Sequence, residues 1–306
     1  KEHQMQKKIK WLLFHEPAEL FIRTAEHFEQ EINRLTGNKY KLEILKLEDY
    51  NDKYNNGEPC DPLKELQEDK VQMSQLYVNS IAGSDATDFY ALCLPFLFDS
   101  HDHCTRVLEG NIGDELMTHL HDKLNIKGLS FTYSGGYKCM ACDTPVKSVE
   151  DFKNLTYKSK RIPVWTAMFD ALGMTPTDHK PNVTQTTFPR YECEAEAGQN
   201  FVADTQHSMY LTTIMMNDSF WNNLSAEDQM HFTTAAKLCA RAERAKSVAD
   251  AEEIKTSGSR QDALGIEDIT KFTDAEVLKL REKLEPVTEQ FAKYFSNNLV
   301  DRIRKS

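Results

Sequence analysis

The sequence predicts a mixed α/β fold with two domains. Strand-like and helix-like patterns alternate along roughly the first quarter of the chain, which favours an open, mostly parallel sheet covered by helices on both faces. A strand–Gly-Gly–strand pattern at 129–146 then marks a crossing into a second domain. With 306 residues, of which 40% are hydrophobic, the chain can bury two cores of ordinary size.

The N-terminal pattern is a strand, a helix and a strand in succession. Ile9–Phe14 is a short apolar strand, and Gly37 ends the helix that follows it. Residues 41–45 alternate as a second strand, a helix is expected over about 62–74, and 75–79 is a third strand. The first helix is predicted from apolar residues that recur every three or four positions: Phe21, Ala25, Phe28, Ile32 and Leu35.

Two crossings divide the chain between the domains. The first lies near 129–135 and the second near 207–216, where Tyr210–Met216 is apolar enough for a strand. The expected first domain is 1–131 plus about 210–250, and the second is 132–209 plus about 251–306. Such repeated crossings indicate a hinge rather than a loose linker.

Two long helices are expected near the C-terminus. Ser225–Asp228 has capping-box spacing and opens an alanine-rich helix to about Lys255. A helix of that length is about 45 Å long, which exceeds one small domain. Thr273–Glu276 is a further capping box that opens a closing helix.

Composition excludes several classes of protein. A net charge of −11 argues against nucleic acid as a partner, because phosphate binding needs a cationic surface. The longest uncharged apolar run, Ala91–Phe98, is eight residues, far short of the roughly 20 that a membrane-spanning helix needs. The apolar segment at the start of the sequence is too short for a signal peptide, so a signal peptide has either been removed or was never there. The seven cysteines are an odd number, so at least one is unpaired, and most are expected to be small buried hydrophobes.

Residues 149–177 form the most informative stretch. Ser148–Asp151 has capping-box spacing, and Leu155 and Tyr157 alternate with polar residues as a half-buried strand does. Lys158 follows at the strand end, where a charge can face a ligand. A helix then presents Val164, Met168 and Leu172 on one face and stops at Gly173.

Three blocks together resemble a known family. They are VEDFKNLTYKSKRIPVWTAMFDALGMTPT at 149–177, FYALCLPFLFDSHDHCTRVLEGNIGDELMT at 89–118 and TQHSMYLTTIMMNDSFWNNLSAEDQ at 205–229. In order and separation they resemble solute-binding proteins of tripartite ATP-independent periplasmic (TRAP) transporters, of the dicarboxylate-binding type. The resemblance implies a two-domain periplasmic-binding-protein-like fold with a long spine helix and a ligand cleft between the domains.

The resemblance also implies a function. A periplasmic protein, acting as a monomer, would capture a small, anionic organic solute by hinge closure and deliver it to TRAP membrane subunits. It would need no cofactor or metal, and it would not be an enzyme. Two alternatives stay open: an enzyme, hydrolase or isomerase, with a lysine and a carboxylate in its cleft, and a ligand-sensing module of the same fold.

The family's ligand-binding arginines match lysines in this chain. Lys158 matches the arginine that holds the ligand carboxylate, and Lys138 matches a second cation in a Gly-Tyr-Lys turn. A lysine offers a point charge where an arginine offers a planar fork, so carboxylate recognition would differ. Arg161 could supply that fork, and the alternative for each lysine is a solvated surface group.

Further ligand-binding candidates follow from the resemblance or from strand ends. Gln185, Thr187 and Phe188 match a polar segment of the family that supplies hydrogen bonds and an aromatic wall to the ligand. Before this segment the family usually has a further helical stretch of about ten residues, where this chain has only 178–184. Either these residues are deleted or a loop is missing from the sequence. Asn217 could orient a ligand or cap the next helix. The strand ends add Glu16 and Asn79 as hydroxyl partners, and aromatic residues that could form walls or simply pack in the core: Tyr77, Phe131, Tyr133 and Trp165.

Metal and redox motifs are weak. His101 and His103 have the wrong spacing for a helical zinc pair, and Cys139 and Cys142 lie in a strand region rather than at a helix start. Neither pair is expected to be functional. The sequence also lacks a Walker loop, a G-x-S-x-G elbow and a G-x-G-x-x-G motif.

Overall fold

A computed structural model describes residues 5–159 and 162–306, and it divides the chain into two compact units. Unit 1 contains residues up to Ala86, Gly113–Thr132 and Thr212–Ala245; unit 2 contains Thr87–Ile112, Tyr133–Leu211 and Lys246–Ser306. Residues 87–112 thus belong with the second unit, whereas the sequence analysis assigned them to the first. The physical reason is their bonding: Phe96 N donates to His207 O at 2.7 Å, and the His103 Nε2 lies 2.8 Å from Ile303 O.

Unit 1 is built on a five-stranded sheet in the order β2-β1-β3-β10-β4. β1 pairs in parallel with β2 and β3, and β10 is antiparallel to β3. The elements are β1 (Lys7–Leu13), α1 (Ala18–Thr36), β2 (Tyr40–Lys46), α2 (Leu47–Tyr54), α3 (Pro62–Gln67), β3 (Met73–Tyr77), α4 (Val78–Gly83), α6 (Asn111–Leu124), β4 (Ile126–Tyr137), β10 (Met209–Asn217), α9 (Asp218–Asn222) and the first part of α10 (Ala226–Thr256).

Helix α1 shows how the apolar spacing produces the fold. Phe21, Ala25, Phe28 and Ile32 are all buried, and the helix packs against β1 and β2. Gly37 ends it with φ of 66°, a left-handed conformation that glycine adopts without a steric penalty. The predicted helix over 62–74 was too long. Its helical part, α3, ends at Gln67, and the separate helix α2 was not predicted.

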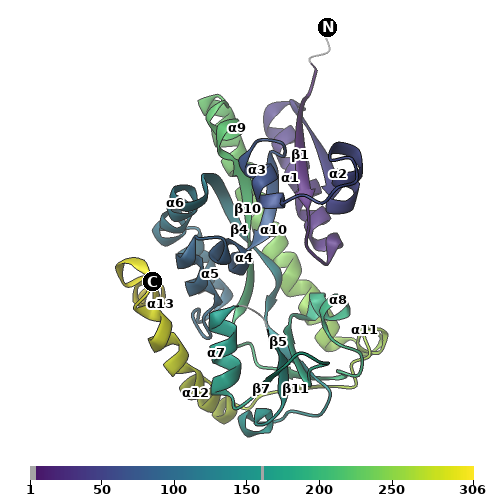
Figure 1. Ribbon diagram of the computed structural model, residues 1–306, viewed down its shortest axis with the longest axis vertical. Coiled ribbons are helices and arrows are strands. Elements are labelled where there is room, and N and C mark those ends of the chain that lie inside the picture. The colour runs from purple at the N-terminus through teal and green to yellow at the C-terminus, as the bar shows by residue number, and fades with distance from the viewer. Residues whose placement is uncertain (1–4, 160–161) are drawn as a thin grey trace. The chain divides into compact units, whose positions relative to one another are not determined.

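Unit 2 is built on a six-stranded mixed sheet in the order β11-β9-β5-β8-β6-β7. In Figure 1, α7 and α12 lie side by side, and these two helices pack against each other. The elements are η1 (Thr87–Cys93), α5 (His101–Leu108), β5 (Cys139–Cys142), η2 (Val149–Phe152), β6 (Thr156–Lys158), α7 (Pro163–Ala171), β7 (Thr175–Thr177), β8 (Val183–Thr186), η3 (Phe188–Arg190), α8 (Tyr191–Glu194), β9 (Phe201–Asp204), α11 (Gly258–Ala263), β11 (Asp268–Lys271), α12 (Asp274–Ala292), η4 (Ser296–Asn298) and α13 (Leu299–Lys305).

The predicted helix starts agree with the structure. Ser148 and Asp151 form a complete capping box, although it opens a short 3-10 turn rather than an α-helix. Ser225 accepts from the backbone N–H of Asp228 at 3.0 Å, and the 31-residue helix α10 follows, which confirms the long helix. Thr273 accepts from the backbone N–H of Glu276 at 3.2 Å at the start of α12.

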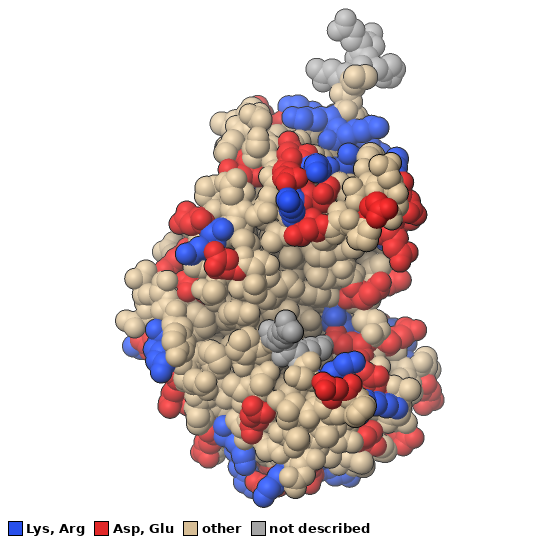
Figure 2. Space-filling model, in the orientation of Figure 1, with Lys and Arg blue, Asp and Glu red and all other residues tan. Residues whose placement is uncertain are grey.

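Charged side chains of both signs are interspersed on the face of the molecule seen in Figure 2. Among the residues that the structure describes, none of the helices combines the length and the apolar composition that crossing a bilayer requires.

Candidate functional site

A small cavity in unit 2 brings together three of the predicted ligand-binding candidates, which are Lys158, Trp165 and Gln185. Its volume is about 30 Å³, which is room for one or two water molecules. Lys158 ends β6 and Gln185 lies on the neighbouring strand β8. The cavity is lined by aromatic, polar and charged side chains: Tyr157, Lys158, Trp165, Phe169, Val183, Thr184, Gln185 and Glu194.

Lys138 packs against Trp165, one of the aromatic side chains that line this cavity, and against Tyr210. It follows β4, and its backbone N–H donates to Ser208 O at 2.8 Å. The ammonium Nζ lies 3.9 Å from the centre of the Trp165 ring and 4.6 Å from that of Tyr210. The side chain is 1% exposed, and a cation–π contact of this kind is worth about 2 kcal/mol when it is shielded from water. A positive charge is therefore held in a low-dielectric corner of unit 2.

A hydrogen-bonded chain orients Gln185. His207 Nε2 lies 2.8 Å from Gln185 Oε1, and its Nδ1 lies 2.6 Å from Thr205 Oγ1. Burial, and then the Lys138 charge, lower the pKa of His207 to about 3, so the imidazole is neutral at physiological pH. Since a neutral ring has one N–H, Nε2 donates to the Gln185 oxygen and Nδ1 accepts from the Thr205 hydroxyl.

Glu194, a carboxylate in the cavity lining, is hydrogen-bonded by an arginine. Arg190 Nε donates to Glu194 Oε2 at 2.7 Å, and its NH1 donates to Ser134 Oγ at 2.9 Å. The guanidinium carbon also lies 4.6 Å from the Tyr210 ring centre. This pair therefore offsets the charge of Glu194 at the cavity.

The other predicted residues of unit 2 lie in internal contacts. The Tyr133 hydroxyl lies 2.9 Å from His101 Nδ1. The Thr187 hydroxyl donates to Ser134 O at 3.0 Å. Phe188 is 2% exposed and belongs to a buried apolar cluster of this unit. Arg161 lies outside the described residues.

The ligand-binding candidates predicted in unit 1 lie at three separate positions of its fold. The Tyr77 hydroxyl donates to Glu16 O at 2.6 Å at the ends of β3 and β1. The expectation that Asn79 ends a strand is wrong, because β3 stops at Tyr77 and Asn79 lies in α4. Asn217 is the N-cap of α9: its Oδ1 accepts from Phe220 N at 2.8 Å and its Nδ2 donates to Leu66 O at 2.7 Å.

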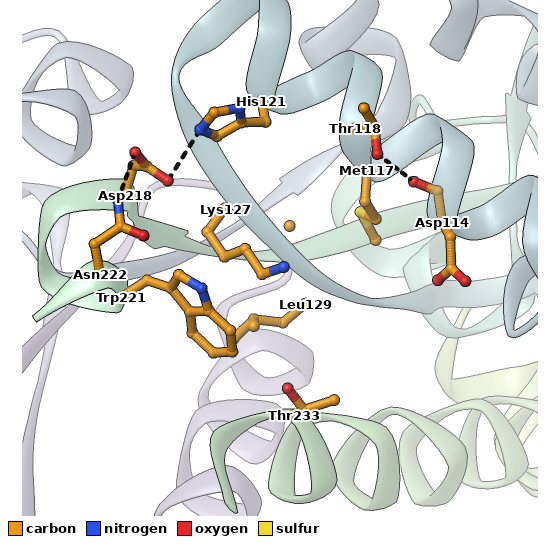
Figure 3. Close-up of a pocket in the computed structure, with 11 residues that line it drawn as sticks. Asp114, Met117, Thr118, His121, Lys127, Leu129, Asp218, Trp221, Asn222 and Thr233 are labelled. Carbon is orange, nitrogen blue, oxygen red and sulfur yellow. Dashed lines mark hydrogen bonds and ion pairs between the residues drawn. The ribbon is translucent and has the colours of Figure 1, made fainter. Parts of the chain in front are cut away.

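A larger hollow of about 470 Å³ lies in unit 1 and contains none of the predicted residues. In Figure 3 the Lys127 side chain extends into it beside Trp221, whose ring centre lies 4.7 Å from Nζ. On its rim His121 Nε2 lies 3.1 Å from Asp218 Oδ1. Asp114 is a second carboxylate in the lining. Two carboxylates face an open hollow here, so it suits an anionic ligand less well than the smaller cavity of unit 2.

The metal and thiol motifs are accounted for by packing. The described residues contain no group of three or more His, Cys, Asp or Glu side chains that could hold a metal ion. Cys139 and Cys142 are buried free thiols on β5, and burial raises the pKa of Cys142 to about 12. A thiol of that pKa stays protonated and unreactive at neutral pH.

The comparisons with known proteins agree with this architecture. The chain matches the bacterial extracellular solute-binding proteins of family 7 over residues 14–184 and 192–294. It belongs to that family. The C4-dicarboxylate-binding periplasmic protein DctP of Rhodobacter capsulatus is 25% identical over 276 residues, which cover 81% of this chain and 80% of the relative.

Solved structures of TRAP periplasmic solute-binding proteins show the same fold. The protein from Sulfurospirillum deleyianum, with bound succinate, is 18% identical with a TM-score of 0.79, over 98% of this chain and 99% of that one. The protein from Pseudomonas putida F1, with bound D-glucuronate, is 17% identical with a TM-score of 0.77, over 98% of this chain and 97% of that one. At these identities the likeness establishes the fold alone.

The family match is interrupted over 185–191, the segment that carries Gln185, Thr187 and Phe188. The roles given to these three residues therefore stay predictions. His207, which is hydrogen-bonded to Gln185, and Arg190, which is paired with Glu194, were not predicted from the sequence. A signal for His207 was present, because Thr205 and His207 fall within one of the three resembling blocks.

Proposed function

We propose that this family 7 member captures a small organic acid and hands it to the membrane subunits of a TRAP transporter from the periplasm. The observation that carries the proposal is the positive corner of unit 2, where Lys158 lines the cavity with Trp165 and Gln185 and the buried Lys138 lies against the Trp165 ring. A carboxylate placed there would gain charge-assisted hydrogen bonds, which are about twice as strong as neutral ones.

The solute class follows from the relatives and from these charges. Relatives of this fold hold acids that range from succinate to D-glucuronate. With lysines at both positions, the carboxylate would meet two point charges rather than an arginine fork. Capture would proceed by hinge closure, in which the ligand favours the closed state through contacts absent from the open one. We propose that the protein acts as a monomer and performs no chemistry on its solute.

Calorimetric titration with succinate, D-erythronate and D-glucuronate tests this proposal. Wild-type protein should bind at least one of these acids, and Lys158→Met should weaken that binding by about 10- to 100-fold, the value of one hydrogen bond to a charged group. Lys147→Met is the matched control, because Lys147 is an exposed lysine of the same unit that does not line the cavity. Equal losses in the two variants, or no binding by the wild type, would contradict the proposal.

A further inference from the structure

The indole N–H of Trp165 is a buried donor that meets no acceptor in the part of the chain that the structure describes. Trp165 lies on α7, lines the cavity of unit 2 and is 5% exposed. Its Nε1 has no hydrogen-bond partner among the described residues. A buried donor left unpaired is destabilising, so an acceptor supplied from outside would be favoured.

The side-chain amide of Gln185 supplies a second donor at the same cavity. Its oxygen is already occupied by His207 Nε2 at 2.8 Å. The amide plane is thereby fixed, and the two N–H bonds of Nε2 are left for another acceptor, since the described residues provide none. His207 acts here as a positioning residue, since it sets which end of the amide is free.

The donors at this cavity therefore match an acceptor-only group. An ionised carboxylate accepts through two oxygens and donates nothing. Lys158 adds a cation at the strand end, and the Lys138 ammonium lies 3.9 Å from the Trp165 ring centre. Glu194, a carboxylate in the cavity lining, accepts from Arg190 through Oε2 at 2.7 Å, which offsets its charge.

We propose that Trp165 Nε1 and Gln185 Nε2 together donate to a terminal carboxylate of the solute, forming a subsite that selects for that group. The inference rests on the proposed function and adds a specificity-determining residue, Trp165, to it. A cavity of about 30 Å³ accommodates the carboxylate head but not the body of an organic acid, so the remainder of the solute lies outside it. Nε1 is closed to water in this structure, so the proposal requires the side chains around it to shift as the carboxylate enters.

Nitrogen-15 spectra of the indole groups test the subsite on the wild-type protein. The chain has three tryptophans, so wild-type protein gives three indole signals, and Trp165→Phe identifies the one from Trp165. Titration with whichever of succinate, D-erythronate or D-glucuronate binds best should move the Trp165 indole proton downfield, as a new hydrogen bond to an anion does. The signals of Trp11 and Trp221 should stay in place.

Calorimetry on variants gives the second readout. Trp165→Phe keeps an aromatic ring and loses the N–H, and it should weaken binding of the same acid by about 10- to 100-fold. Gln185→Leu should do the same. Trp221→Phe in unit 1, outside this cavity, should bind as the wild type does.

The outcomes separate the two proposals. If the wild type binds an acid, Lys158→Met weakens it, and yet the Trp165 signal stays fixed while Trp165→Phe binds normally, the subsite is overturned and the proposed function stands. If the wild type binds none of the acids, both are overturned. A moved Trp165 signal in the wild type supports the subsite even where Gln185→Leu fails to fold.

Discussion

Protonation of His207 should make unit 2 less stable in mild acid. The ring is 1% exposed, and burial together with the nearby Lys138 charge lowers its pKa from 6.5 to about 3. Between these two pH values His207 is protonated in the unfolded chain but stays neutral in the folded one. The free energy of unfolding therefore falls as the pH is lowered through that window, and this contribution is fully present above pH 6.5.

The size of the effect follows from the two pKa values. At pH 5 the unfolded imidazole is almost fully protonated and the folded one is neutral, which corresponds to about 2 kcal/mol lost relative to pH 7. His207→Gln has no imidazole to titrate, so its stability should fall by about 2 kcal/mol less than that of the wild type over the same range. The variant's stability at pH 7 does not enter the comparison.

Urea denaturation followed by circular dichroism, at pH 7 and pH 5, measures this difference. His179→Gln serves as the control, because His179 is exposed and this variant should keep the wild-type dependence on pH. Equal losses of stability in wild type and His207→Gln would refute the buried neutral imidazole, and with it the assigned orientation of Gln185.

Three further predictions concern residues outside the cavity. Asn217→Ala should lower the free energy of unfolding by about 2–3 kcal/mol in urea denaturation, because it removes the N-cap of α9 and the hydrogen-bond donor to Leu66 O. Weaker solute binding at unchanged stability would instead give Asn217 a role in ligand binding. Gly135→Ala should be more destabilising than Gly37→Ala in the same assay. Both glycines have positive φ, but a Cβ at Gly135 would meet Thr187 Oγ1 at 2.0 Å, whereas nothing lies within 4 Å of a Cβ at Gly37. Similar losses of stability in the two variants would contradict the close packing at Gly135. A thiol reagent at pH 8 should modify the exposed Cys193 in the native protein and reach Cys139 and Cys142 only after unfolding; rapid native reaction of either would mean that β5 opens readily.

The sequence was sufficient where local chemistry decides the structure. The apolar period of α1, its terminal Gly37 and the capping serine before α10 each act within a few residues, so their patterns predict the elements. The predicted 62–74 helix was too long because Val71 and Met73 are buried in and near a strand, a tertiary contact that the helical spacing does not reveal. Residues 87–112 were assigned to the first unit because their bonds to His207 and Ile303 join positions about 110 and 200 residues apart.

Part of the candidate site could be predicted from the sequence, and part depends on contacts that form only in the folded unit. Lys158 and Gln185 could be named from the resemblance, and the structure places both at one cavity. The aromatic enclosure of Lys138 by Trp165 and Tyr210 depends on three segments that meet only in the folded unit. The orientation of Gln185 depends on His207, which lies on a different segment, so it could not be inferred from sequence spacing.

The central claim is that the lysines of unit 2 hold the carboxylate of a small organic acid. The most direct measurement is a crystal structure, or a nitrogen-15 spectrum of the lysine side chains, of the chain with the best-binding acid of the succinate, D-erythronate and D-glucuronate panel. The expected result is a carboxylate within hydrogen-bond distance of Lys158, beside Trp165 and Gln185. An acid bound elsewhere, with Lys158 and Lys138 unaffected, would contradict it.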